Sequence, residues 1–216
     1  MPVTVETRYL YNGELNSRWF TVTGLSVVVL AILSIMLTAI TVAREWERGS
    51  MELLLSTPVS PLEIIIGKLA PYLLMGLIGQ FIIYLAARLL FNVPFVGSHL
   101  LLFLATLLFL VAGLAQGLLI SVTTRHQIAA IQFSQMMGQL PANMLSGFVF
   151  PIESMPAFFQ YFTMIFPARW FMVVMRGIFL RGAGLSELAV PLLMLLALDV
   201  FFIALAVRRF KRDVEP

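Results

Sequence analysis

Long runs of uncharged, mostly apolar residues alternate with short polar segments along this chain. Each run has about 20 residues or more, the length that an α-helix needs to cross a hydrocarbon core ~30 Å thick. Transmembrane β-strands would instead alternate apolar and polar residues. The pattern therefore predicts five transmembrane helices, over residues 19–43, 69–87, 100–124, 127–152 and 188–207.

The segment 153–187 follows a different pattern. Residues 157–166 form a mostly apolar run between Pro156 and Pro167. This run is too short to cross a bilayer and too apolar for an open loop. A second short helix is expected over 170–180, with glycines after it to end it. We therefore expect a re-entrant or interfacial helix pair before the last span.

The polar segment 44–68, between the first two spans, is neither a simple loop nor a further span. Charged residues crowd its start, three leucines follow, and Pro58 breaks the helix. Ser60, Pro61 and Glu63 then match an N-cap, a first helical residue and the third-position partner of a capping box. This pattern predicts a short amphipathic helix at the membrane surface, a turn, and a helix that enters the membrane. Such a segment is either a capped surface loop or a docking element for a soluble partner.

Composition leaves no room for a soluble catalytic domain. Of the 216 residues 60% are hydrophobic and 12% are charged, with a mean hydropathy of +0.97, whereas about a quarter of the residues of a soluble domain are charged. Gly67-Lys68 lacks the earlier glycine and the following hydroxyl residue of a phosphate-binding loop. Without cysteine, and with only His99 and His126 at opposite ends of one predicted span, we expect no metal site and no catalytic residue.

The basic residues lie beside the apolar runs, which indicates membrane orientation rather than binding of nucleic acid. If 44–68 is cytoplasmic, that side holds eight Lys and Arg residues and the other side holds six. The strongest anchor is the RRFKR cluster at 208–212. The expected orientation therefore has the N-terminus outside and the C-terminus in the cytoplasm.

Two polar features lie inside the predicted spans. Four amides recur every three or four residues and so share one helix face: Gln132, Gln135, Gln139 and Asn143. Because amides avoid lipid, this stripe is expected to form interhelical hydrogen bonds, to line a substrate path, or to form a dimer seam. Pro141 is expected to bend the helix. Gly113 and Gly117 form a GxxxG pair, typical of close helix packing.

Asp199 lies near the middle of the last span. A carboxylate at that depth is expected to be paired, protonated or in contact with water. Coupling of transport to protons through Asp199 would indicate a secondary carrier.

Three stretches of the chain resemble a known family. The run RExERGSMELLLSTPVSPLEIIIGKLAPY resembles the signature loop of ABC-2 type permeases, the membrane subunits of a class of ATP-binding-cassette exporters. YNGELNSRWF resembles the end of the extracytoplasmic domain in the multidrug-efflux branch, and LSGFVFPIESMPAFFQYFTMIFPARWFMVVMRGIFLRGAGL resembles its paired re-entrant helices. These matches cover most of 9–212.

The resemblance implies an all-α polytopic membrane protein with a coupling helix that sits in a cleft of an ATPase subunit. The implied contacts are Glu45, Arg48, Glu52, Thr57 and Pro58. The chain itself would bind no cofactor, since ATP and Mg²⁺ would be used by the partner subunit. A second permease copy, identical or related, would complete a transporter in the bacterial inner membrane that exports a drug-like or lipid-like substrate.

Members of that branch carry an additional N-terminal span followed by an extracytoplasmic domain. We therefore expect this chain to correspond to the last five spans of a six-span subunit. Residues 1–18 would be an extracytoplasmic remnant, 19–212 the membrane domain, and 213–216 a cytoplasmic tail. Two alternatives stay open: a stand-alone carrier or channel that uses Asp199 and the amide stripe, and a truncated remnant that does not transport.

Overall fold

The computed structural model describes residues 17–55 and 59–214, and every regular element in these ranges is helical. This confirms the prediction of an all-α fold. Four of these helices are long and apolar enough to cross a membrane: α1 (Ser17–Glu47), α3 (Pro61–Leu89), α4 (His99–Thr124) and α8 (Leu185–Val214). The chain is therefore a multi-pass membrane protein.

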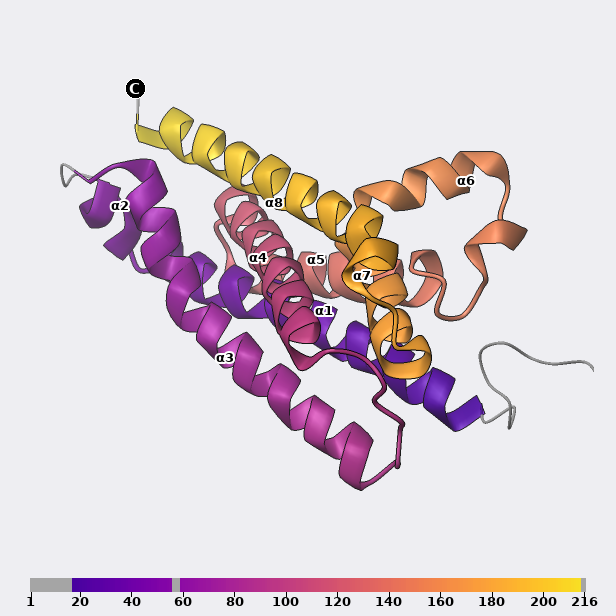
Figure 1. Cartoon of the computed structure of the whole chain (residues 1–216). Coiled ribbons are helices and arrows are strands. Elements are labelled where there is room, and N and C mark those ends of the chain that lie inside the picture. The colour runs from indigo at the N-terminus through magenta and orange to yellow at the C-terminus, as the bar shows by residue number, and fades with distance from the viewer. Residues whose placement is uncertain (1–16, 56–58, 215–216) are drawn as a thin grey trace, which may run out of the picture.

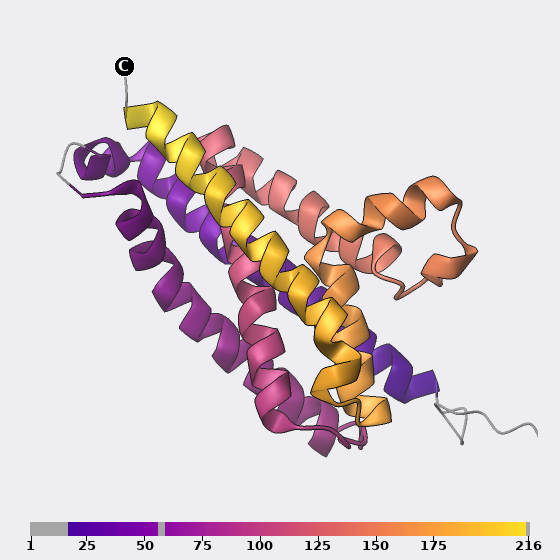
Figure 2. The same cartoon turned by 45° about the horizontal axis from the view of Figure 1, so that its top comes forward.

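The four long helices form a bundle with α4 at its centre, in contact with α1, α3 and α8 (Figure 1). We name each of the two ends of the bundle by the residues that connect two helices there. At the 44–68 end, α1 passes through the short α2 (Ser50–Leu55) into α3. At the 90–98 end, α3 passes into α4. The C-terminal end of α8 lies at the same end of the bundle as α2 (Figures 1 and 2).

Close packing of α1 on α4 explains the glycine pair of the third predicted span. A Cβ atom on Gly113 would lie 2.8 Å from the Cβ of Ser34, and one on Gly117 would overlap the backbone oxygen of Ile35. The Thr38 hydroxyl also donates a hydrogen bond of 2.8 Å to the Leu114 carbonyl across this contact. The GxxxG pair therefore packs two helices of the same chain.

After α4 the chain turns into α5 (Gln127–Leu140), which continues as a wider π-helical turn, η1 (Pro141–Leu145). Pro141 cannot donate the backbone hydrogen bond that an α-helix needs at this position, and the ladder widens there. The helix predicted over 127–152 therefore ends at Leu145.

The segment before α8 contains two helical stretches, 157–165 and 167–181, at an angle of 91° to each other. Such a bent pair is either a broken span or a re-entrant loop. The second stretch ends at Gly182, whose φ of +65° is left-handed. The elements are η2 (Ile152–Ser154), α6 (Ala157–Phe162), η3 (Thr163–Ile165), α7 (Pro167–Arg176) and η4 (Gly177–Arg181).

These two stretches have different surroundings. α7 lies in the core, where the ring of Phe171 stacks on that of Phe109 of α4 with centroids 4.2 Å apart. α6 projects from the bundle (Figure 1) and exposes aromatic side chains such as Phe158 and Tyr161. Exposed aromatic rings of this kind are typical of a segment at a membrane interface.

Candidate functional site

The candidate docking element is α2 at the 44–68 end. Gly49 precedes it with a φ of +72°, and this left-handed residue separates α2 from α1. Met51 of α2 is fully buried in a hydrophobic cluster that includes residues of α1, α3 and α4. Leu53, on another side of the helix, is 72% exposed. α2 is thus anchored through Met51, with Leu54 packed against the same cluster, and exposes Leu53.

The residues predicted to contact an ATPase have different positions. Arg48 is exposed at the end of α1. Glu45 is half-buried and its carboxylate forms an ion pair with Lys68 of α3, which ties the two helices together. Thr57 and Pro58 lie outside the described residues, as does the side chain of Glu52. The role of all five residues in docking stays a prediction.

The start of α3 has the predicted cap. The Glu63 backbone N–H donates to the Ser60 hydroxyl at 3.3 Å, and the Ser60 N–H donates to the Glu63 carboxylate at 2.9 Å. This reciprocal pair is a capping box, and Pro61 occupies the first turn as expected. The predicted start of a helix at Pro61 is therefore confirmed.

A second polar cluster links the end of α1 to the turn between α4 and α5. Glu47 accepts a 2.7 Å hydrogen bond from the Gln127 backbone N–H and another from the Gln127 side-chain amide. Arg44 donates to the Gln127 side-chain oxygen at 3.2 Å. The Arg125 guanidinium lies 4.6 Å from the centre of the Trp46 ring. We call these five residues the α1–α5 clamp.

Glu47 lies beyond the uncharged stretch of α1, which ends at Ala43. The hydrogen bonds from the backbone N–H and then from the side chain of Gln127 hold the pKa of the Glu47 carboxyl below its usual value. The sequence alone did not predict this clamp. Charged residues at the end of α1 were visible, but nothing in the sequence paired them with a glutamine 80 positions later.

The predicted amide stripe lies on the outer face of α5. Gln132, Gln135 and Gln139 are exposed, and Asn143 in η1 is half-buried. The opposite face of α5 packs on α1, where a Cβ on Gly138 would lie 3.2 Å from the Cα of Ile32. The stripe therefore points away from its own chain.

Asp199 lies on the face of α8 that packs in the bundle, and its side chain is almost completely buried. Its Oδ1 atom has no hydrogen-bond partner among the described residues. Asp199 is thus buried within the bundle, and its protonation and role stay predictions.

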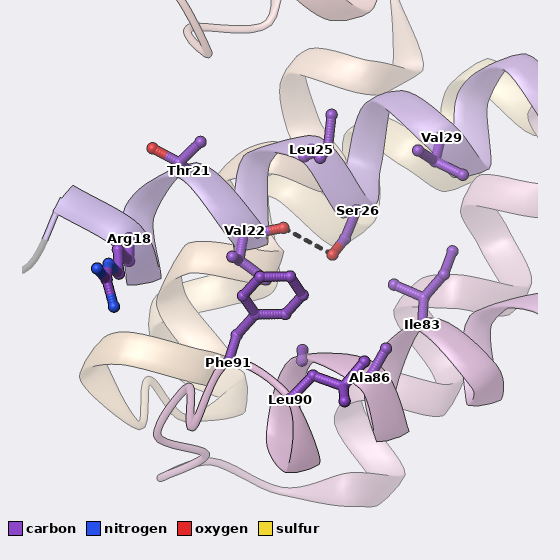
Figure 3. A pocket seen from close by; sticks show the side chains of 11 residues that line it. Arg18, Thr21, Val22, Leu25, Ser26, Val29, Ile83, Ala86, Leu90 and Phe91 are labelled. Carbon is purple, nitrogen blue, oxygen red and sulfur yellow. Dashed lines mark hydrogen bonds between the residues drawn. The ribbon is translucent and has the colours of Figure 1, made fainter.

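A groove of about 710 Å³ separates α1 from α3 near the 90–98 end (Figure 3). Its walls are mostly aliphatic, with Phe91 reaching across and Arg18 at one end. The Ser26 hydroxyl in its wall donates to the Val22 carbonyl at 2.7 Å and is therefore satisfied within α1. In its middle, this groove therefore offers a ligand apolar contacts only.

A family model described as "ABC-2 family transporter protein" matches residues 1–208. The chain therefore belongs to the ABC-2 family, which confirms the resemblance found in the sequence.

Three relatives illustrate the match. "Probable multidrug ABC transporter permease YbhS" of Escherichia coli (strain K12) is 40% identical over 213 residues, which are 99% of this chain and 56% of that protein. "Inner membrane transport permease YhhJ" of the same strain is 30% identical over 98% of this chain and 57% of its own length. "ABC transporter G family member 20" of Dictyostelium discoideum is 31% identical over 95% of this chain and 28% of its own length. The chain thus spans little more than half the length of the bacterial relatives.

Proposed function

We propose that this chain forms permease spans of an ATP-binding-cassette exporter, and that α2 docks into a separate ATPase subunit that binds and hydrolyses ATP with Mg²⁺. The observation that carries the proposal is the geometry of α2, which is fixed to the bundle through Met51 while Leu53 and the neighbouring Arg48 are exposed. In this proposal the 44–68 end lies in the cytoplasm and the N-terminus lies outside.

The α1–α5 clamp supplies a route from α2 to the amide stripe. α2 follows α1 directly, and Glu47 at the end of α1 holds Gln127 at the start of α5. A displacement of α2 by the ATPase would therefore move the first turn of α5 together with the end of α1. Such a movement would bias a two-state membrane dimer through differential contacts.

The proposed cargo is a drug-like or lipid-like compound, and the names of the multidrug relatives support the drug-like class. The proposed assembly holds two permease copies in the bacterial inner membrane. The amide stripe of α5 would line the seam between the copies, where amides find protein or water rather than lipid.

Docking is tested by co-purification from mild detergent with a co-expressed ABC ATPase subunit. We expect Arg48→Glu to reduce the recovered ATPase about tenfold or more, because an interface charge reversal costs several kcal/mol. Arg209→Glu is the matched control, since Arg209 is also exposed on the part of α8 that lies at this end. Deletion of 50–58 should abolish recovery. Absence of the ATPase from the wild-type preparation would contradict the proposal.

Buried Asp199 favours one alternative, a carrier driven by protons. The two functions make opposite predictions for Asp199→Asn, which keeps the shape of the side chain and removes its ionisable group. ATP-driven export should retain most of its rate in vesicles supplied with ATP. Loss of export with normal membrane insertion, together with transport driven by a pH gradient in the wild type, would establish the carrier instead.

A further inference from the structure

A second groove, of about 540 Å³, lies between α3 and α4 on the other flank of α3. Leu74, Ile78 and Phe81 of α3 and Phe103 of α4 line it and are each about half exposed or more. These side chains would face hydrocarbon in a bilayer, so the groove opens sideways into the membrane. Its volume falls within the ~300–1,000 Å³ typical of small-molecule sites.

Two polar side chains that line this groove are unsatisfied. Gln80 of α3 is 5% exposed and Thr106 of α4 is 1% exposed. Neither the amide nitrogen and oxygen of Gln80 nor the hydroxyl of Thr106 has a hydrogen-bond partner among the described residues. An unsatisfied polar group in hydrocarbon is strongly unfavourable. These groups therefore call for a ligand that supplies hydrogen bonds.

Thr106 differs in this respect from other hydroxyl residues of the bundle. Ser26, Ser121 and Ser134 each donate to a backbone carbonyl three or four residues earlier in their own helix. This is the usual way in which a hydroxyl is satisfied inside a membrane helix. The Thr106 hydroxyl makes no such bond, although the same kind of carbonyl precedes it in α4. Its donor is thus left without a partner among the described residues.

The two unsatisfied groups lie at a similar depth. Gln80 is nine residues from Leu89 at the end of α3, and Thr106 is seven residues from His99 at the start of α4. At ~1.5 Å per residue, both lie roughly 10–14 Å from the 90–98 end. Nearer that end, one helical turn from Gln80, the Tyr84 hydroxyl is hydrogen-bonded to the His99 ring at 3.0 Å. The groove therefore has a polar outer end, apolar walls, and hydrogen-bonding groups at depth.

This arrangement defines the ligand chemistry. None of the residues that line the groove is a Lys, Arg, Asp or Glu. A charged group on the ligand would therefore have no oppositely charged partner there. A plain hydrocarbon chain would cover the walls but leave Gln80 and Thr106 unsatisfied. We propose that the α3–α4 groove binds an uncharged, drug-sized amphiphile whose apolar body carries an internal amide, carbonyl or hydroxyl group that hydrogen-bonds Gln80 and Thr106. This site is distinct from the amide stripe of α5 and does not depend on an ATPase.

The test uses two photoreactive probes of equal length, a diazirine-bearing dialkyl amide and the corresponding diazirine-bearing hydrocarbon. The protein is reconstituted without ATPase in phosphatidylcholine nanodiscs, irradiated, and mapped by peptide mass spectrometry. We expect the amide probe to label 74–84 and 102–106 about five- to tenfold more than the hydrocarbon, the effect of one or two hydrogen bonds. Excess unlabelled amide should compete. Equal labelling by both probes would overturn the proposal.

Variants identify the hydrogen-bonding groups. Gln80→Leu should lower labelling by the amide probe to the level of the hydrocarbon probe, and Thr106→Val should lower it in part. Gln132→Leu is the matched control, because Gln132 is an exposed amide on α5 that does not line the groove, and it should label as the wild type does. If Gln80→Leu does not fold, the nearly isosteric Thr106→Val carries the test alone. Unchanged labelling in Thr106→Val and Gln80→Leu, or equal loss in Gln132→Leu, would contradict the assignment.

Discussion

At the scale of single residues, the Glu47 carboxylate connects two parts of the chain that lie 80 positions apart. It accepts hydrogen bonds from both the backbone and the side chain of Gln127, and the His126 ring lies 3.8 Å from it. Hydrogen bonds to a carboxylate are stronger than those between neutral groups. Ionised Glu47 therefore holds the α4–α5 turn against the end of α1.

We predict that Glu47→Gln lowers the thermal unfolding temperature of the protein in detergent at neutral pH. The folded-state pKa of Glu47 is lowered below the ordinary value of a glutamate, so its stabilising effect is complete above that ordinary value and is lost as the pH falls through the folded-state pKa. The difference between wild type and variant should consequently shrink in acid. Unfolding curves at pH 7 and at acidic pH measure it.

Glu153→Gln is the control for this experiment. Glu153 is an exposed glutamate whose carboxylate makes no hydrogen bond within the described part of the chain. Its replacement should leave the unfolding temperature unchanged at both pH values. A Glu47→Gln protein as stable as the wild type at neutral pH would show that the clamp contributes nothing to stability.

At the scale of helices, the contact between α1 and α4 depends on the absence of side chains at two positions. A Cβ on Gly117 would overlap the Ile35 carbonyl oxygen and the Thr38 hydroxyl. The Thr38 hydroxyl is also the donor to the Leu114 carbonyl, so any separation of the helices breaks this bond as well. Backbone atoms cannot move aside as a flexible side chain can.

We predict that Gly117→Ala destabilises the bundle by about 1–3 kcal/mol, the usual cost of overpacking. Gly67→Ala is the matched control: Gly67 is also inside a helix, and its new Cβ would meet no atom within 4 Å. That substitution should be neutral or slightly stabilising, because alanine is the better helix former. Reversible unfolding in mixed micelles compares the two. Equal stability of the two variants would rule out the close α1–α4 contact.

The helices differ in how far the sequence could predict them. The long apolar runs predicted α1, α3, α4 and α8, because each span must satisfy its backbone internally over the membrane thickness. The capping box at Ser60 was predictable because it is local. The end of the helix at Leu145 was not, since Pro141 indicates a bend but not whether the chain continues in helical form. The burial of α7 depends on contacts such as Phe109–Phe171, which join distant segments.

The same reasoning applies to the candidate sites. The amide stripe was predictable because its four members share a period of three or four residues, and the docking segment because charges and helix breakers cluster in it. Gln80 gave no such signal, being a single amide in an apolar span. Gln80 belongs to the proposed α3–α4 site only because it lines the same groove as Thr106, which lies on another helix.

At the scale of the whole molecule, the outer face of α5 is the surface that a single chain leaves incomplete. One face of α5 is buried on α1, and the other carries Gln132, Gln135 and Gln139. In a bilayer these amides would each lie in hydrocarbon if the chain were alone. A second copy that meets this face would provide hydrogen-bond partners or a water-filled path.

The absence of cysteine from the chain makes this assembly directly testable, because single introduced thiols have no competitor. We predict that Gln135→Cys forms a disulfide-linked dimer on mild oxidation in native membranes, since equivalent positions of two copies meet across a two-fold seam. Leu196→Cys, on the exposed face of α8, should stay monomeric under the same conditions. Non-reducing gels measure both. Dimers from both variants would indicate random collision, and dimers from Leu196→Cys alone would move the seam to α8. Either outcome would leave the α5 amides to be satisfied by some other segment.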